Sequence, residues 1–491
     1  MIIKNILHNK FYVLIIFLTC TFFIYFNTFY VGLLSDDYGY FIGVANDGWN
    51  SLLNNFNDPF FLPLSHFIQL IIYKIFGQNL YVFHGVQIFF HVLIGWQLYL
   101  ILKEINDQKI IFAFLTGLIF LILPYQTETI IWLASKGYVF CLFFTCLSIK
   151  YYLKGHYNSS YLFIILAIFC KEMGYIIPIL LFIIELYRGQ FSLFKKKIIP
   201  FSLILTSCIT IRFIVLNSLI GGYGGATHLN FNLITVIKTI FAYLIKYATF
   251  YRYSNSILIA ILVFTALIII SIPYIKTLNN KKSINKIILI LALFITSILP
   301  VINLEITSLF SIQSDRYGYF STVIFAIFLS YIICCWKTPK ILMLSILTIT
   351  VFSTLTYLDT KKWVAASEIC NQYLNELIKQ DLENKNVILV NIPDNYKGVY
   401  VLRHGIDEFL ELNNIKGKIS VINYQSFSSL NSGIEIYNSK LKNISCNVIK
   451  TDSLILNQFL LSPWEYDSIL YYNSNSFQPL NSEKNYFWES I

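Results

Sequence analysis

An acidic pair, Asp36-Asp37, follows the first long apolar stretch of the chain directly. Two neighbouring carboxylates in a region of low dielectric constant repel each other, which makes one of them a candidate proton acceptor. The other interpretation is a solvated start of a loop, and for an isolated Asp-Asp pair this is the more common one. The pair therefore indicates a general base only if other residues complete a site around it.

Charged residues also occur inside or between apolar stretches. Arg212 lies within the apolar stretch 198–217, where an unpaired arginine at the bilayer centre costs at least roughly 2.5 to 3.5 kcal/mol. It therefore needs an anion, either a carboxylate partner or the phosphate of a lipid-linked substrate. Lys171 and Glu172 raise the same question, because they either pair with each other or bind a substrate.

Arg316 and Tyr319 stand at the start of another apolar stretch, in the segment SDRYGY. Arg and Tyr often anchor helices at a membrane interface, so anchoring stays open beside a role in substrate binding. His84 and His91 are seven residues apart and project from one face of a helix. Because no third ligand is obvious, buried hydrogen-bonding histidines are favoured over a metal site.

Membrane-spanning helices must position these residues, as the composition indicates. Of 491 residues, 56% are hydrophobic, 17% aromatic and only 13% charged, which leaves too little polar surface for a soluble protein. Stretches of about 20 apolar residues match a hydrocarbon core of roughly 30 Å. We predict an all-α polytopic membrane protein with about eleven spans, near residues 11–33, 80–102, 110–124, 137–153, 160–170, 175–187, 198–217, 256–275, 287–303, 319–335 and 341–358.

The basic residues orient these spans. With the N-terminus inside, sixteen basic residues fall on the inner side, against seven on the outer side before residue 359, as the positive-inside rule requires. The net charge of +10 reflects these anchors and does not indicate nucleic acid as a partner. A single span over 160–187 would place the cluster Lys195–Lys197 outside, so we predict a break at Lys171-Glu172.

The chain after residue 358 is different in character, because Asn and Ser become frequent and acidic residues slightly outnumber basic ones. We predict a transmembrane domain over 1–358 and a small soluble α/β domain over 359–491, on the outer side. Two long outer loops, 34–79 and 217–255, should carry helices in the membrane surface. Eight of the eleven carboxylates before the tail lie on the outer side, which places the functional site there.

The expected elements within these regions follow from periodicity. The surface helices should cover Leu64–Phe76 and Leu233–Tyr251. In the tail, an amphipathic helix is expected over Trp363–Gln380. Short strands should follow at Val387–Ile392, Ile419–Tyr424 and Leu454–Leu460.

Several short segments occur in a characteristic order. They are Ser35-Asp36-Asp37-Tyr38, then Pro63-Leu64 with Phe83-His84 and His91, then Leu123-Pro124 through Glu128 to Trp132 with Ser135-Lys136-Gly137, then Lys171-Glu172, and finally Leu299-Pro300 to Asn303 with Asp315 through Ser321. No single segment is specific, but in this order they resemble the GT-C superfamily of membrane glycosyltransferases. The resemblance is closest to the transmembrane O-mannosyltransferases that usually carry tetratricopeptide repeats, and to their bacterial relatives, over most of residues 30–370. Leu62 departs from the arginine usual in that family, and the tail replaces the repeats, which leaves room for a different acceptor.

The resemblance implies an enzyme that inverts the anomeric centre as it moves a sugar from a polyprenyl-phosphate carrier to an acceptor on the outer face. It implies no cofactor, nucleotide-sugar site or essential metal. Asp36 or Asp37 would accept the proton of the attacking hydroxyl, and the other would orient it. The implied substrate-binding residues are Lys171, Glu172, Arg212, Arg316, Tyr319 and His84. Their cations would hold the lipid phosphate and stabilise it as the leaving group.

Two other functions stay open. A transporter or flippase of a lipid-linked sugar would also need many spans and intramembrane charge, although the hydropathy shows no inverted repeat. A non-catalytic scaffold that presents the tail would not need the acidic pair. The abundance of Ile, Asn, Lys and Tyr is typical of an AT-rich genome, so we expect a bacterial inner membrane, with the N-terminus cytoplasmic and the tail periplasmic. The acceptor would be a glycan, a lipid or a protein.

Overall fold

The computed structural model divides the chain into two compact units. The first unit comprises Met1–Phe29 and Asp47–Thr360, and the second comprises Tyr30–Asn46 and Lys361–Ile491. The described residues are 6–479 without 53–59, 106–109, 218–231, 254–256, 279, 303–311, 381, 383–384, 391, 416–417, 422–423, 427–453, 457–458, 462–467 and 473–476. The acidic pair therefore belongs to the same unit as the tail, whereas the predicted phosphate-binding residues belong to the first unit.

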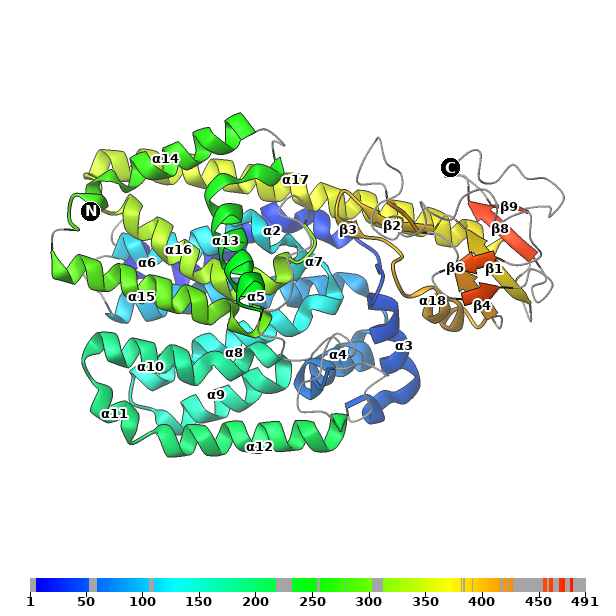
Figure 1. The fold of residues 1–491 in the computed structure, drawn as a ribbon, viewed down its shortest axis with the longest axis horizontal. Coiled ribbons are helices and arrows are strands. Elements are labelled where there is room, and N and C mark those ends of the chain that lie inside the picture. The colour runs from blue at the N-terminus through cyan, green and yellow to red at the C-terminus, as the bar shows by residue number, and fades with distance from the viewer. Residues whose placement is uncertain are drawn as a thin grey trace. The chain divides into compact units, whose positions relative to one another are not determined.

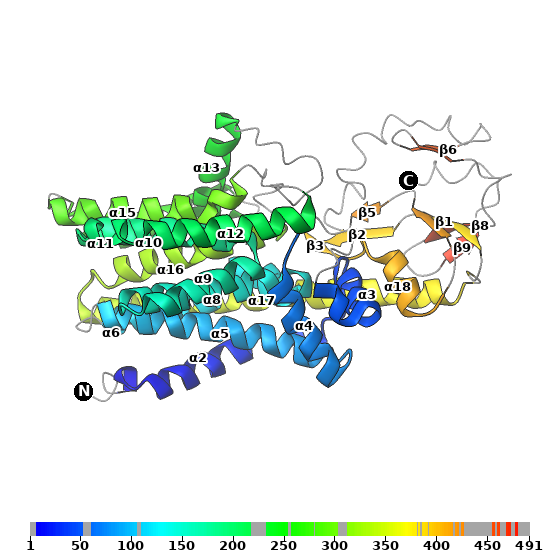
Figure 2. The same ribbon diagram turned by 90° about the horizontal axis from the view of Figure 1, so that it is seen from below.

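The first unit consists of helices, and the long ones run roughly along one direction (Figures 1 and 2). The helices along this direction are α2 (Lys10–Tyr25), α5 (Leu80–Ile105), α6 (Ile110–Ile122), α8 (Lys136–Leu153), α9 (Tyr157–Cys170), α10 (Ile177–Arg188), α12 (Ile198–Leu216), α14 (Ile257–Ile275), α15 (Lys281–Ile298), α16 (Tyr319–Ile333) and α17 (Thr338–Ile378). The other helices include α4 (Pro63–Phe76), α7 (Thr127–Ile131), α11 (Phe191–Lys195) and α13 (Leu233–Thr249). The boundary between the units falls within α17.

Among the described residues, eight helices are long and apolar enough to cross a membrane, and a bent pair would make a ninth. This confirms a mostly helical membrane protein. In the spans that contain α5, α8 and α16, respectively 61%, 67% and 72% of the most apolar 18-residue stretch is buried. These three helices therefore form the centre of the bundle. In α12 and α14 only 17% and 11% is buried, and their exposed apolar side chains are suited to contact lipid.

The count of eleven spans stays a prediction. Nine predicted spans correspond to the eight helices and the bent pair, which joins α6 to the turn Pro124–Gln126 and α7 at an angle of 59°. The other two correspond to α9 and α10, with 14 and 12 residues, which is short of the roughly 20 that a bilayer requires. The chain does break between them, where the 3-10 turn η6 (Glu172–Ile176) follows Lys171.

Both long loops contain the expected helix, α4 and α13, while the location of these helices in the membrane surface stays a prediction. In both views α13 lies across the direction of the long helices (Figures 1 and 2). The predicted tail helix from Trp363 is helical to Ile378, but it is continuous with the last span because α17 does not end at residue 358. No Gly or Pro occurs in 359–362, so the fall in hydropathy changes the surroundings of the helix and not its backbone.

The second unit contains α3 (Asp37–Asp47), α18 (Ile406–Leu412) and short strands. One sheet has the order β4-β1-β8-β9, with β4 (Lys418–Val421) and β8 (Ser468–Tyr472) parallel to β1 (Asn386–Val390) and with β9 (Phe477–Pro479) antiparallel to β8. A second sheet has the order β3-β2-β5, and β6 pairs with β7; their bounds are Val399–Tyr400, Ile392–Tyr396, Tyr424–Ser426, Leu454–Leu456 and Phe459–Leu461. Each predicted strand thus corresponds to two shorter strands. The first corresponds to β1 and β2 and the second to β4 and β5, one strand in each sheet, and the third corresponds to the pair β6–β7.

Candidate functional site

Lys171, Glu172 and Arg212 form one group of ion pairs in the first unit, which we call the Lys171 cluster. Lys171 Nζ lies 3.2 Å from Glu172 Oε2, and Arg212 Nη2 lies 3.2 Å from Glu172 Oε1. Arg212 therefore has a carboxylate partner, and Lys171 and Glu172 pair with each other. Burial opposes the ionisation of Glu172, but Lys171 and Arg212 outweigh it and hold the pKa of this carboxyl below its usual value.

The Lys171 cluster carries a surplus of one positive charge among its described residues, because one carboxylate serves two cations. It is not sealed, since the side chains of Lys171, Glu172 and Arg212 are 10%, 20% and 8% exposed. Aromatic rings complete its lining: Lys171 Nζ lies 3.7 Å from the ring centroid of Phe60 and 5.3 Å from that of Tyr138. Such rings stabilise a cation without neutralising its charge.

The break between α9 and α10 creates this cluster. Lys171 has an extended backbone after the last residue of α9, and the turn η6 follows. The carbonyl groups freed by the break find new partners, because Ser65 donates to Cys170 O at 2.9 Å and Cys141 Sγ lies 3.5 Å from Lys171 O. A buried break in a helix is tolerated where other protein groups satisfy its backbone in this way.

A histidine and a second lysine lie near the cluster. Burial, together with the smaller effect of the nearby charges of Lys136 and Lys171, lowers the pKa of His66, on α4, to about 3. His66 is therefore neutral near physiological pH. Lys136, in the first turn of α8, is itself only 7% exposed.

Arg316 pairs with Glu128, a residue that the sequence placed in the family-like segments without a role of its own. The Arg316 backbone N–H donates to Glu128 Oε2 at 2.7 Å, and its guanidinium pairs with Glu128 Oε1. The guanidinium carbon lies 4.9 Å from the ring centroid of Trp132 and 4.5 Å from that of Tyr317. The pair is therefore fixed by charge, by a backbone hydrogen bond and by two aromatic faces.

Glu128 lies on α7, the short helix after the bend in the chain. The bend frees backbone carbonyl groups, and Gln87 on α5 donates to two of them, Thr129 O at 2.6 Å and Trp132 O at 3.1 Å. A buried amide side chain thereby replaces the missing helical hydrogen bonds. Gln87 is a polar residue within the largely apolar sequence of α5. This contrast was the signal in the sequence that could have identified it as a hydrogen-bonding residue.

Tyr138 lies between the Lys171 cluster and the Arg316–Glu128 pair. Its ring is 5.3 Å from Lys171 Nζ, and its centroid is 6.3 Å from that of Tyr317. The Tyr317 hydroxyl in turn accepts a hydrogen bond of 2.9 Å from Arg316. The structure therefore brings the three predicted phosphate-binding cations, Lys171, Arg212 and Arg316, into one region of the first unit.

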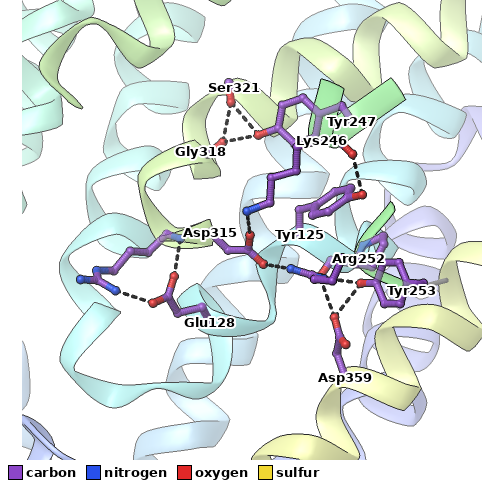
Figure 3. A network of polar contacts seen from close by, with 12 residues as sticks. Tyr125, Glu128, Lys246, Tyr247, Arg252, Tyr253, Asp315, Gly318, Ser321 and Asp359 are labelled. Carbon is purple, nitrogen blue, oxygen red and sulfur yellow. Dashed lines mark hydrogen bonds and ion pairs between the residues drawn. The ribbon is translucent and has the colours of Figure 1, made fainter. Parts of the chain in front are cut away.

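A second group of ion pairs, the Arg252 cluster, comprises Lys246, Arg252, Tyr253, Asp315 and Asp359 (Figure 3). Both Lys246 and Arg252 pair with Asp315. Arg252 Nη2 also donates to Asp359 at 2.6 Å, to the Tyr253 hydroxyl at 2.5 Å and to Pro124 O at 3.1 Å. Burial opposes the charge on Arg252, but Asp315 and Asp359 hold the pKa of this guanidinium well above its usual value.

Sequence reasoning missed this cluster. It counted Lys246 and Arg252 only as outer-loop charges, and it assigned Asp359 to the soluble tail. A usable signal was the pattern of α13, whose polar positions Thr239, Tyr243 and Lys246 follow helical spacing and are all buried. The opposite face is apolar and exposed, with Leu233 at 69% and Phe241 at 59%, as expected for a helix whose outer face meets lipid.

Tyr319 and His84, the other predicted substrate-binding residues, are fully buried on α16 and α5. The Tyr319 hydroxyl lies 2.8 Å from Nδ1 of His91, and Nε2 of that histidine lies 3.2 Å from Leu121 O. His91 is thus a buried hydrogen-bonding histidine. Within the described part of the chain, no group of three or more His, Cys, Asp or Glu residues is arranged to hold a metal ion.

The acidic pair lies in the second unit, where its two members have different environments. Asp37, the first residue of α3, is 2% exposed and accepts a hydrogen bond of 3.1 Å from Leu34 N–H, which ties it to the loop before the helix. Asp36 is partly exposed and accepts a hydrogen bond of 3.2 Å from the Ser35 hydroxyl. Asp36 is therefore the more accessible carboxylate, and Asp37 is the one engaged by the backbone.

Residues of the tail hold the loop that carries this pair. Ser35 has a positive φ of 48°; its N–H donates to Val401 O at 2.9 Å and its hydroxyl accepts from His404 N–H at 3.3 Å. Gly405 follows with a φ of 98°, and a Cβ atom there would lie 2.4 Å from Ser35 O. Only glycine fits such a close approach, so the tail and the acidic loop form one assembly.

Comparisons of the chain with protein-family models, with curated proteins and with solved structures gave no match. A function for the chain is therefore inferred from the arrangement of its own residues.

Proposed function

We propose that this protein is an inverting glycosyltransferase that moves a sugar from a polyprenyl-phosphate donor to an acceptor on the outer face of the membrane. The order of the short segments that resemble the GT-C superfamily supports this proposal. We also propose eleven spans, an outer C-terminal α/β domain that binds or orients the acceptor, and a bacterial inner membrane as the location. The acceptor would be a glycan, a lipid or a protein.

The observation that carries the proposal is the surplus positive charge of the Lys171 cluster, close to the Arg316–Glu128 pair. An uncompensated charge at membrane depth is costly, and an anionic ligand removes this cost. A phosphate suits the site because guanidinium and ammonium groups bind its oxygens with charge-assisted hydrogen bonds. A lipid-linked phosphate would also reach such a site from the bilayer.

In the proposed reaction, the acceptor hydroxyl oxygen attacks the anomeric carbon and forms the new glycosidic bond. The bond from that carbon to the phosphate oxygen breaks, and its electron pair leaves with the polyprenyl phosphate. Asp36 takes the hydroxyl proton as general base, while Asp37 keeps the loop in position through Leu34 N–H. Lys171, Arg212 and Arg316 stabilise the negative charge that grows on the leaving phosphate.

The experiment is the release of polyprenyl phosphate by the purified protein from a panel of polyprenyl-phosphate sugars, with Asp36→Asn as the test variant. Asp47→Asn is the matched control, because Asp47 ends the helix that follows the acidic pair. Release should fall by about 10²-fold or more in Asp36→Asn, the usual contribution of a general base, and stay at the parental rate in the control. Equal rates in all three proteins would contradict the assignment of the base.

A flippase for a lipid-linked sugar is the second candidate, and the bent pair at Glu128 favours it, since transporters often build their sites from discontinuous helices. The same preparation separates the two functions. Movement of polyprenyl-phosphate sugars across liposome bilayers without any release of polyprenyl phosphate would support the flippase and exclude the transferase.

A further inference from the structure

Arg252 connects three parts of the first unit that are far apart in the sequence. Through its guanidinium it contacts Asp315 before α16, Asp359 on α17 and the carbonyl of Pro124 at the bend after α6. Lys246 adds a second cation to Asp315, and its own carbonyl accepts a hydrogen bond of 2.6 Å from the Tyr125 hydroxyl. Figure 3 shows these contacts converging from separate helices.

Two of these parts carry the two halves of the Arg316–Glu128 pair. Asp315 directly precedes Arg316, and Pro124 begins the short turn that leads into the helix of Glu128. A cluster that fixes Asp315 and Pro124 together therefore fixes the backbone on both sides of the ion pair.

A contact from α13 tightens the same region. The Tyr247 hydroxyl donates to Gly318 O at 3.2 Å and lies 2.7 Å from Ser321 Oγ. A Cβ atom at position 318 would lie 2.6 Å from that hydroxyl and 2.8 Å from Tyr243 Cε1, so a larger residue there would displace these side chains. The turn that carries Arg316 is thus held from α13 at its start, through Asp315, and at its end, through Gly318.

The Arg252 cluster has no spare charge for a ligand. Among the described residues its two cations face two carboxylates, and none of these four side chains is more than 2% exposed. We propose that Arg252 and Lys246 are positioning residues, which hold the Arg316–Glu128 pair at the place where the donor phosphate binds. The positioning of the pair follows from these contacts, whereas the binding of the donor phosphate beside it rests on the proposed function.

Trp132 provides a spectroscopic test, because its ring lies against the Arg316 guanidinium. The protein is labelled with 5-fluorotryptophan, and the Trp132 resonance is assigned with Trp132→Phe. Arg316→Gln then defines the resonance of a ring without the guanidinium. The test variants are Lys246→Met and Arg252→Gln, and the control is Arg188→Gln, which also removes a cation from a buried carboxylate, Glu185, but in α10.

We expect both test variants to move the Trp132 fluorine resonance toward its position in Arg316→Gln, and the control to leave it at the parental position. We also expect an increase of about tenfold in the KM for the donor, the effect of losing roughly 1.4 kcal/mol of binding, with the KM for the acceptor unchanged. If Arg252→Gln does not fold, Lys246→Met decides, because Asp315 keeps Arg252 as its partner there.

A parental Trp132 resonance in folded Lys246→Met protein would overturn the positioning proposal, whatever happens to the KM. If the resonance shifts in the variants but the parent protein releases no polyprenyl phosphate from any donor, the positioning stands and the proposed function is refuted.

Discussion

The Arg252 cluster and the Lys171 cluster use the same kinds of side chain for different ends. In the Arg252 cluster, two cations and two carboxylates balance each other, with side chains at most 2% exposed. In the Lys171 cluster, two cations share one carboxylate, and the side chains are 8–20% exposed. Among the described residues, charge balance and access therefore separate a group of ion pairs that holds helices together from one that is ready to take an anion.

The physical reason is the cost of removing charge from water. A fully buried pair is tolerated only when each charge has its partner and its remaining hydrogen bonds are made. A site that is partly open keeps some hydration, so it can exist with a surplus charge and exchange water for a ligand. The comparison predicts opposite responses to mutation in the two clusters.

The largest expected effect is on stability. Arg252→Gln removes the cation that pairs with both Asp359 and Asp315, and breaking a buried pair costs about 3–5 kcal/mol. Arg212→Gln should cost much less, because Glu172 keeps Lys171. Unfolding of the purified proteins in mixed micelles with increasing SDS measures both. Equal losses would remove the distinction between the clusters.

The next effect is on donor use. Lys171→Gln and Arg212→Gln should each reduce kcat/KM for the donor by about 10- to 100-fold, because hydrogen bonds to charged groups contribute roughly 1.5–3 kcal/mol. Lys154→Gln is the control, since Lys154 forms an exposed ion pair with Glu104. Steady-state kinetics with varied donor checks this, and unchanged kcat/KM in both test variants would place the phosphate elsewhere.

A smaller effect concerns pH. The folded protein holds the pKa of Glu172 below its ordinary value of 4.5, so its charge stabilises the protein fully above about pH 4.5 and loses this effect as the pH falls through the lowered pKa. The difference in unfolding free energy between parent and Glu172→Gln should be constant near neutral pH and shrink in acid. A difference that grows in acid would show that Lys171 and Arg212 do not act on Glu172 in this way.

The smallest expected effect is that of salt. The Debye length falls from about 30 Å at 0.01 M to about 3 Å at 1 M salt, so binding of polyprenyl phosphate at the partly open Lys171 cluster should weaken over this range. The contribution of the Arg252 cluster to stability, measured as the difference between parent and Lys246→Met, should stay constant because it is sealed from the solvent. A difference that disappears in salt would show that this cluster is open as well.

Much of the helical architecture could be predicted from the sequence, because a run of about 20 apolar residues has few other solutions. The break at Lys171-Glu172 was also accessible, since the positive-inside rule required an extra crossing. The continuity of α17 through Asp359 was not, because the hydropathy falls there while the partner that buries Asp359, Arg252, lies 107 residues away.

The site was predictable only in part for the same reason. The need of Arg212 for an anion could be stated, but nothing in the spacing names Glu172 as that anion. Likewise, Ser35 meets His404 across 369 positions, so the assignment of the acidic loop to the unit of the tail depends on folding over a distance that periodicity does not record.

The most direct test is the binding of sugar-free polyprenyl phosphate to the purified protein, compared among the parent, the Lys171→Gln/Arg212→Gln double variant and Lys154→Gln. We expect saturable binding to the parent and to Lys154→Gln and a loss of about 100-fold or more in the double variant, in line with two lost charge-assisted hydrogen bonds. Undiminished binding by the folded double variant would contradict the claim that the surplus charge of the Lys171 cluster receives the donor phosphate.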